Sequence, residues 1–203
     1  MNKINYNNLM KEEIGKLTTK PKLLLHSCCG PCSTSVLDRL RDYFCITIFY
    51  FNPNIDTNEE FLKRLGEEKK VVKNFNEKNI NKIEIVQVEY DNSEFYSLTK
   101  NLTNEPEGGK RCDVCFALRL DRTAKFAKEN GFDYFSTTLS VSPHKNSEKL
   151  NTIGLRLSEK YGVKFLVGDF KKEDGYKKSI EFSKQLGLYR QDYCGCEFSK
   201  NRK

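Results

Sequence analysis

The sequence predicts an α/β fold of Rossmann-like type, with a parallel sheet of about five strands and helices on both faces. Short apolar or β-branched runs alternate along the chain with segments whose apolar residues recur at helical spacing. The connecting loops are short, which favours right-handed crossovers between parallel strands. Because the chain has 203 residues, we expect one domain, 1–203, with an N-terminal extension, 1–20, and an irregular tail, 188–203, that carries Cys194 and Cys196.

Five segments are expected to be strands. A short apolar run marks the first strand, β-branched and aromatic residues mark the second, and alternation of apolar and polar residues marks the third. Asn52-Pro53 ends the second strand. In chain order the expected strands are Lys22–Ser27, Cys45–Phe51, Ile83–Tyr90, Phe132–Ser140 and Lys164–Val167.

Helical spacing predicts the segments between and after these strands. Pro31 suits the first turn of the first helix, Gly162 lies at the end of the fourth, and the last helix runs from about Tyr176 to a natural cap at Gly187. The faces of the first four helices are marked by Val36, Leu37 and Leu40; by Phe61, Leu65, Val72 and Phe75; by Ala117, Leu120, Ala124 and Ala127; and by Leu150, Ile153 and Leu157.

Composition excludes several classes of protein. The 14 Phe and 10 Tyr residues, against only 12 Gly and 5 Pro, argue against a disordered chain. No apolar run is long enough to span a membrane, and Met1–Leu17 lacks the apolar region of a secretory signal, so we expect a cytosolic protein without a membrane partner. The net charge of +7 suits RNA about as well as it suits an ordinary solvated surface.

Two expected strands end in residues that can carry chemistry. The first continues into HSCCGPC at 26–32, and the fourth continues into SVSPH at 140–144. In an open parallel sheet, ligands bind outside the carboxyl ends of the strands. We therefore expect the functional site at this edge.

Seven of the eight cysteines form three clusters, namely Cys28, Cys29 and Cys32; Cys112 and Cys115; and Cys194 and Cys196. In a reducing cytosol, metal ligands or redox thiols are expected rather than structural disulfides. Two clusters brought together supply the four sulfurs of a zinc site or of a [4Fe–4S] cluster. Iron–sulfur is favoured because these cysteines lie at strand-to-helix junctions of a larger fold, whereas structural zinc usually occupies a small module of its own. Cys45, inside an apolar strand, is expected in the core.

Cys194-Gly195-Cys196 permits two interpretations. Cysteines separated by one residue can form a disulfide only in a tight ring, and a strained disulfide is labile and suited to redox work. The alternative is that they are extra metal ligands or unpaired thiols in a tail. We favour the redox pair.

Other polar residues near the clusters are less specific. His26 and His144 flank the expected site, although a single histidine is more often structural than catalytic. Arg111, Arg119, Arg122 and Lys125 are most simply a solvated helix face, and they could also face RNA.

Five segments, in order along the chain, are HSCCGPCS at 26–33, FNPNI at 51–55, EGGKRCDVCFALRL at 107–120, TTLSVSPHKN at 137–146 and YRQDYCGCEFS at 189–199. They resemble the cobalamin-independent epoxyqueuosine reductases, the QueH family. The resemblance runs from about Lys22 to Ser199, nearly the whole chain.

The resemblance implies an oxidoreductase that acts on tRNA carrying epoxyqueuosine at the wobble position of the anticodon. It implies removal of the epoxide oxygen to give queuosine, the last step of queuosine biosynthesis, on a fold like that of nucleotide-hydrolase domains. The implied cofactor is a [4Fe–4S] cluster, with room for an additional iron. The electrons come from a donor that the sequence does not identify.

Carried over onto this sequence, the resemblance gives the cluster ligands as Cys28, Cys29, Cys112 and Cys115, and a redox-active disulfide as Cys194 with Cys196. Spacing alone favours Cys29 with Cys32, because adjacent side chains on an extended strand point in opposite directions. A turn at the strand end can still bring Cys28 and Cys29 together, so we follow the family. Cys32 is then a thiol in the cavity or a ligand of the additional metal.

Substrate contacts are expected from residues beside the site. Tyr193 or His144 could donate a proton. Lys145, Asn146, Arg111 and the basic residues of the C-terminus are expected to contact the RNA, while aromatic residues stack a splayed base.

Two other functions stay open. One is a zinc-bound RNA-binding module without catalysis, and the other is an ATP-using tRNA-modifying enzyme of related fold. Against the second, the first strand continues into Ser27-Cys28-Cys29-Gly30 and not into a G-x-x-x-x-G-K-[ST] or Ser-Gly-Gly-x-Asp loop.

Overall fold

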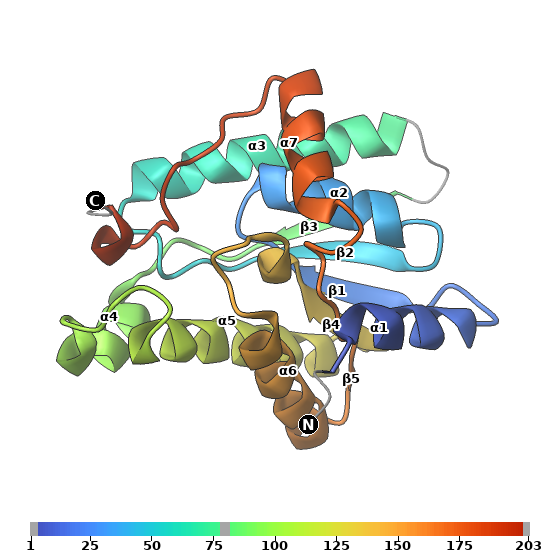
Figure 1. Cartoon of the computed structure of the whole chain (residues 1–203), viewed down its shortest axis with the longest axis horizontal. Coiled ribbons are helices and arrows are strands. Elements are labelled where there is room, and N and C mark those ends of the chain that lie inside the picture. The colour runs from blue at the N-terminus through green and yellow to red at the C-terminus, as the bar shows by residue number, and fades with distance from the viewer. Residues whose placement is uncertain (1–3, 78–81, 201–203) are drawn as a thin grey trace.

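A computed structural model describes residues 4–77 and 82–200. Its centre is a five-stranded, all-parallel sheet with the order β3-β2-β1-β4-β5 (Figure 1). The strands are β1 (Lys22–His26), β2 (Cys45–Tyr50), β3 (Glu84–Gln87), β4 (Tyr134–Thr137) and β5 (Lys164–Phe165). The predicted α/β fold with a parallel sheet of about five strands is confirmed.

Helices cover both faces of the sheet. In Figure 1, α2, α3 and α7 lie on one side, and α4, α5 and α6 lie on the other. Within the described ranges the helices are α1 (Tyr6–Gly15), α2 (Gly30–Leu40), α3 (Asn58–Glu77), α4 (Ser93–Thr99), α5 (Lys110–Glu129), α6 (Ser147–Tyr161) and α7 (Gly175–Gln185). None of them is long and apolar enough to cross a membrane.

Alternation along the strands divides the core into two layers. Leu23 and Leu25 of β1 belong to the cluster that includes Leu37 and Leu40 of α2. Leu24 points to the opposite face and joins the cluster that holds Leu120 of α5. All of these side chains are fully buried, so both faces of β1 are dry, as expected for the central strand of a parallel sheet.

The carboxyl end of β1 lies at the point where the strand order reverses. His26 is in register with Phe49 of β2 on one side and with Thr137 of β4 on the other. From β1 the chain continues to β2 and β3 on one side and later to β4 and β5 on the other. Such a switch point leaves a crevice between the two diverging connections. The 27–32 segment, which carries three cysteines, occupies it.

All five strands are shorter than the sequence predicts, the first two by a single residue each. The third covers Glu84–Gln87 rather than Ile83–Tyr90, and the fifth only Lys164–Phe165. The fourth ends at Thr137, where the Thr137 side chain accepts a hydrogen bond from the Leu139 nitrogen (3.2 Å) and turns the chain into a 3-10 helix over Thr138–Val141. Side-chain hydrogen bonds of this kind compete with strand pairing.

The N-terminal extension contains a helix that the sequence analysis missed. Asn5 caps α1 by accepting a hydrogen bond from the Asn8 nitrogen, and Met10 is buried in the core at 1% exposure. Glu13 accepts a hydrogen bond from the Tyr134 hydroxyl (2.7 Å), which ties α1 to β4. The many Asn, Lys and Glu residues of this segment hide its short apolar face. The seven-residue α4 was also not predicted, because two turns are too short to show a helical period.

Candidate active site

The turn between β1 and α2 brings three thiols together. The Sγ atoms of Cys28, Cys29 and Cys32 lie within 4.8 Å of one another, and those of Cys28 and Cys29 are 3.7 Å apart. Cys29 is the N-cap of α2. A Cβ atom at position 30 would lie 2.6 Å from the backbone carbonyl oxygen of Glu67. Only glycine therefore lets α2 begin this close to α3. The structure therefore brings Cys29 close both to Cys28, as the family resemblance implies, and to Cys32, as the spacing favours.

Hydrogen bonds within the trio concentrate negative charge on one sulfur. Thiols of Cys29 and Cys32 donate to Cys28 and hold its pKa well below the usual range. The same sharing raises the pKa of Cys29 to about 12 and raises that of Cys32. The N-terminus of α2 also favours a thiolate here.

The remaining four clustered cysteines lie beside this trio. Cys112 and Cys115 are on the first turns of α5, and the buried Cys115 and Cys196 pack in one small cluster with Phe95. Burial raises the pKa of Cys115 to about 12, and neighbouring Cys194 and Cys196 add to that rise. All eight cysteines are free thiols in this structure. The disulfide between Cys194 and Cys196 stays a prediction.

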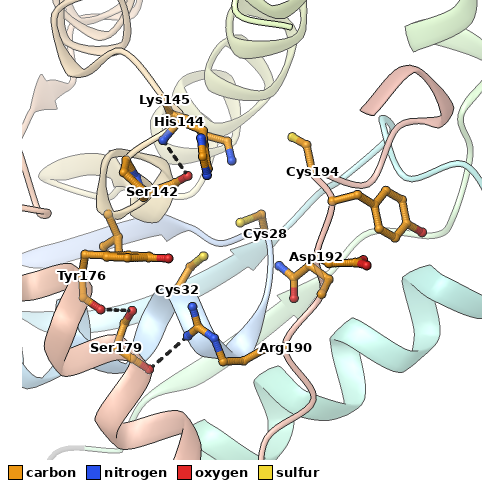
Figure 2. Close-up of a pocket in the computed structure, with 14 residues that line it drawn as sticks. Cys28, Cys32, Ser142, His144, Lys145, Tyr176, Ser179, Arg190, Asp192 and Cys194 are labelled. Atoms are coloured by element: carbon orange, nitrogen blue, oxygen red, sulfur yellow. Dashed lines mark hydrogen bonds between the residues drawn. The ribbon is translucent and has the colours of Figure 1, made fainter. Parts of the chain in front are cut away.

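Cys194 connects the two groups of thiols. It interacts electrostatically with Cys112 and Cys115, and it also lines a pocket together with Cys28 and Cys32. Figure 2 shows Cys194, from the tail, across the pocket from Cys32. Cysteines from three distant segments therefore lie near one another at one edge of the sheet, although among the described residues only the trio after β1 has its sulfur atoms close enough to share one ion.

The pocket beside these thiols is polar and has a volume of about 320 Å³. In Figure 2 the loop after β4 lies above the cysteines and α7 lies opposite the tail. The lining residues are Cys28, Cys32, Val141, Ser142, Pro143, His144, Lys145, Tyr176, Ser179, Arg190, Gln191, Asp192, Tyr193 and Cys194.

Lys145 contributes positive charge to the pocket. Burial opposes its charged form, but the neighbouring Cys194, Cys28 and Cys32 outweigh that effect and raise the pKa of the ammonium group. Lys145 is therefore a cation at neutral pH, placed against the thiols.

The other predicted substrate residues have different surroundings. His144 is exposed and Tyr193 half-buried, and both line the pocket. The Asn146 side chain caps α6 by accepting hydrogen bonds from the Glu148 and Lys149 nitrogens. Arg111 is 3% exposed and lies off the pocket lining, where it donates to the carbonyl oxygens of residues 102 and 103.

His26 has a structural role. Its Nε2–H donates to the Phe51 carbonyl oxygen (3.1 Å), and its Nδ1 accepts from the Thr137 hydroxyl (3.0 Å). Burial and the nearby Arg119 lower the pKa of His26 to about 3, so the ring is neutral. It joins the carboxyl ends of β1, β2 and β4 beneath the thiols.

Helix α3 holds the tail over the site through Arg64, a residue that the sequence analysis did not select. Arg64 is 1% exposed, forms an ion pair with Glu60 (2.6 Å), and donates to the carbonyl oxygens of Cys194 (3.0 Å) and Tyr193 (3.5 Å). The Asp56 nitrogen donates to the Gly195 carbonyl (3.0 Å). The irregular tail is thereby anchored on both sides of Cys194.

Glu68 is a buried carboxyl directly behind the cysteine turn, and it too was missed. The Ser27 hydroxyl donates to it (2.7 Å), while burial raises the pKa of Glu68 to about 7. The sequence does contain one indication of this role, because Glu68 lies on the apolar face of α3, four residues after Arg64.

Two expectations about individual residues were wrong. Arg119 is completely buried and Arg111 nearly so, whereas only Arg122 and Lys125 form the expected solvated face of α5. Arg119 follows Cys115 by four residues and thus shares its side of the helix. Cys45 is exposed rather than in the core, because it is the first residue of β2, at the end of the sheet away from the site.

The donor set suits a soft metal or metal cluster. In the described part of the chain, the group of ligand atoms close enough to share one ion is the sulfur trio. Thiolates select zinc, copper(I) and iron–sulfur clusters over magnesium or calcium. The buried cations Arg64 and Arg119, with Lys145, suit an anionic metal–thiolate group.

Comparison with known proteins gives one family. A model of the family described as "Epoxyqueuosine reductase QueH" matches residues 23–202. The chain is 42% identical to epoxyqueuosine reductase QueH of Staphylococcus epidermidis, over 97% of this chain and 85% of that protein. It is 40% identical to the protein of that name from Streptococcus pyogenes, over 97% and 78%, and 38% identical to that of Thermotoga maritima, over 87% and 89%. With matches across nearly its whole length, the chain belongs to the epoxyqueuosine reductase QueH family of oxidoreductases.

Proposed function

We propose that this protein reduces epoxyqueuosine to queuosine at the wobble position of tRNA, the last step of queuosine biosynthesis. Family membership supports the reaction. The observation that carries it is a polar pocket of about 320 Å³ whose wall holds Cys28, Cys32 and Cys194, one cysteine or more from two of the three clusters, with Cys115 of the third in electrostatic range of Cys194. A sulfur-rich centre next to a cavity is what a reductive deoxygenation needs.

The cofactor in this proposal is a [4Fe–4S] cluster. Cys28, Cys29, Cys112 and Cys115 would hold it, and Cys32 would be free to bind an additional iron. Burial of Cys29 at 0% and of Cys28 and Cys115 at 7% supports ligation, since buried thiols are protected from oxidation. When bound, the cluster would supply single electrons and a Lewis-acid iron.

A pair of thiols can provide all the electrons and protons that the reaction consumes. Removing the epoxide oxygen breaks two C–O bonds, forms one C=C bond, and uses two electrons and two protons to release water. Oxidation of Cys194 and Cys196 to a disulfide supplies both electrons and both protons. The position of Cys194 on the pocket wall supports this role. An external donor, still unidentified, would reduce the disulfide between turnovers.

The residues of this chain bind and orient the substrate. Lys145, held as a cation, would bind an anionic or oxygen-rich part of the nucleotide. Tyr193 or His144, at the pocket wall, would relay to the substrate one of the two protons that the dithiol releases. A second pocket of about 600 Å³ shares Pro143, His144 and Lys145 and extends to Lys171 and Lys172. Its lysines suit RNA phosphates. Arg202 and Lys203 lie outside the described residues.

The test combines metal analysis with turnover. Protein purified without oxygen should contain about four or five irons per chain, show the brown colour of an iron–sulfur protein that bleaches on reduction, and convert epoxyqueuosine tRNA when given a reductant. A colourless protein with one zinc and no turnover would instead support a non-catalytic RNA-binding module. ATP-dependent turnover without iron would support the ATP-using alternative.

A further inference from the structure

Arg119 is a buried cation with two free ends. Its side chain is completely buried on α5, and its Nε–H donates to the Cys115 carbonyl oxygen (3.2 Å). Within the described residues, Nη1 and Nη2 make no hydrogen bond of good geometry, and the Cys115 thiol is the side chain near enough to act on them as an acceptor. A buried guanidinium without acceptors is strongly unfavourable unless another group compensates its charge.

Arg64, which is also almost completely buried, shows how a buried guanidinium charge is usually compensated. All three nitrogens of Arg64 have acceptors, and one acceptor is the Glu60 carboxylate. Arg119 has no such carboxylate among the groups that act on it most strongly. Those groups are cysteines, namely Cys115, Cys194 and Cys28, and they outweigh burial and raise the pKa of Arg119.

The cysteines around Arg119 come from all three clusters. Cys28 follows β1, Cys115 is on the same helix as Arg119, and Cys194 is in the tail. The guanidinium of Arg119 thus acts electrostatically on thiols from all three clusters. Its free N–H groups are therefore available as donors to sulfur.

We propose that Arg119 is the built-in counter-charge of the metal centre, a positioning residue that stabilises the anionic metal–thiolate group and raises its reduction potential. This inference rests on the proposed iron–sulfur function. Four thiolates outweigh the positive charge of a [4Fe–4S] core, and each added electron makes the centre more negative. A fixed positive charge therefore favours the reduced form, and hydrogen bonds to sulfur act in the same direction.

The first test measures reduction potential in iron-loaded protein. Wild type, Arg119→Lys, Arg119→Gln and the control Arg122→Gln are matched for iron and titrated while the reduced cluster is followed by electron paramagnetic resonance. Arg122 is an exposed residue of the same helix, paired with Glu94 (3.0 Å). We expect Arg119→Gln to lower the reduced-to-oxidised ratio at fixed potential at least tenfold, about 59 mV for one electron. Arg119→Lys should shift it less, and Arg122→Gln should not shift it.

Equal potentials in wild type and Arg119→Gln would overturn the proposal. If Arg119→Gln binds no iron, Arg119→Lys decides: retained iron shows that charge is what matters, and loss of iron from both variants shows a purely structural role. An iron-free wild type would instead contradict the proposed function, and the two failures are thus distinguishable.

The second test needs no activity and no loaded cluster. In the metal-free protein the buried Nη1 and Nη2 groups of Arg119 have no hydrogen-bond acceptor of good geometry among the described residues, so Arg119→Met should melt at the same temperature as wild type or higher. Metal loading should then raise the melting temperature of Arg119→Met less than that of wild type. If metal-free Arg119→Met melts clearly below wild type, Arg119 is a structural part of the core and the proposal fails.

Discussion

The Arg64 guanidinium donates a hydrogen bond from Nη1 to the Cys194 carbonyl oxygen over 3.0 Å, which fixes a thiol-bearing tail to a helix 130 residues earlier in the chain. The same nitrogen would be 3.0 Å from a side chain on Gly195, whose φ is +123°. Arg64 and Gly195 therefore set the path of the tail together.

Replacing Arg64 should release the tail without emptying the proposed cluster site. Arg64→Met removes charge-assisted hydrogen bonds and leaves Glu60 without its ion pair, so we expect the free energy of unfolding to fall by about 2 kcal/mol. Alkylation of Cys194 should become faster, while iron content should stay close to that of wild type. Lys73→Met, on an exposed position of α3, is the matched control. Unchanged alkylation of Cys194 would mean that other contacts hold the tail.

The ligand assignment predicts opposite results for two cysteines. Cys115→Ser should lose most of the iron, because a hydroxyl is a poor replacement for a thiolate. Cys45→Ser should keep the iron, the turnover and the stability of wild type, since Cys45 is exposed at the start of β2. Iron analysis and absorption spectra of the two variants compare them directly. Bleaching by Cys45→Ser but not by Cys115→Ser would exclude this ligand set.

The dithiol assignment predicts a kinetic defect in Cys196→Ser. The deoxygenation uses two electrons, whereas one [4Fe–4S] cluster usually exchanges one. At matched iron content, we expect Cys196→Ser to fail in multiple-turnover reduction of epoxyqueuosine tRNA. Counting free thiols in wild type after mild oxidation should show a loss of two. Loss of iron from the variant would make Cys196 a ligand instead, and unchanged turnover would make the pair a bystander.

Glu68 should destabilise the metal-free protein as pH rises. The pKa of Glu68 is about 7 in the folded state because of burial, against an ordinary value of 4.5, so the folded state retains a proton that the unfolded state loses between these values. Stability is therefore lost as pH rises from about 4.5 to 7, and Glu68→Gln should gain about 3 kcal/mol at pH 8 and less than about 1 kcal/mol at pH 5. Urea unfolding measures this, with the exposed Glu77→Gln as control.

His26 should act in the opposite direction. Burial lowers the pKa of His26 to about 3 from 6.5. Between these two pH values the unfolded state binds a proton at His26 and the folded state does not. Stability is therefore lost as pH falls below 6.5, by about 2 kcal/mol between pH 7 and 5. Over that interval the two groups nearly cancel. Relative to wild type, metal-free His26→Gln should gain stability on acidification and Glu68→Gln should lose it. Parallel pH profiles for the two variants would contradict both assignments.

The sequence was sufficient to predict the parallel sheet and the position of the cysteine clusters. Hydrophobic runs located all five strands, and cysteines at strand-to-helix junctions indicated which edge holds the site. The cations were harder to find. An arginine on a helix usually faces water, so Arg119 and Arg64 were not distinguished from Arg122, although helical spacing places Arg119 on the side of Cys115. Burial of such residues depends on how the tail and α3 close over the cysteines, and that information is spread across segments 130 residues apart.

The groups that position the thiols differ from the groups that place charge near them, as the neutral ring of His26 illustrates. Three strand ends meet on the His26 imidazole, which carries no charge and so holds the strand ends together beneath the thiols without adding a charge of its own. Positive charge near the sulfurs comes from side chains on other elements, namely Arg64 on α3, Arg119 on α5 and Lys145 on a loop. Substitutions on those outer elements can adjust the chemistry of the centre over generations while the strands that position it stay unchanged. The architecture is in that sense evolvable: driving force and geometry reside in different parts of the chain.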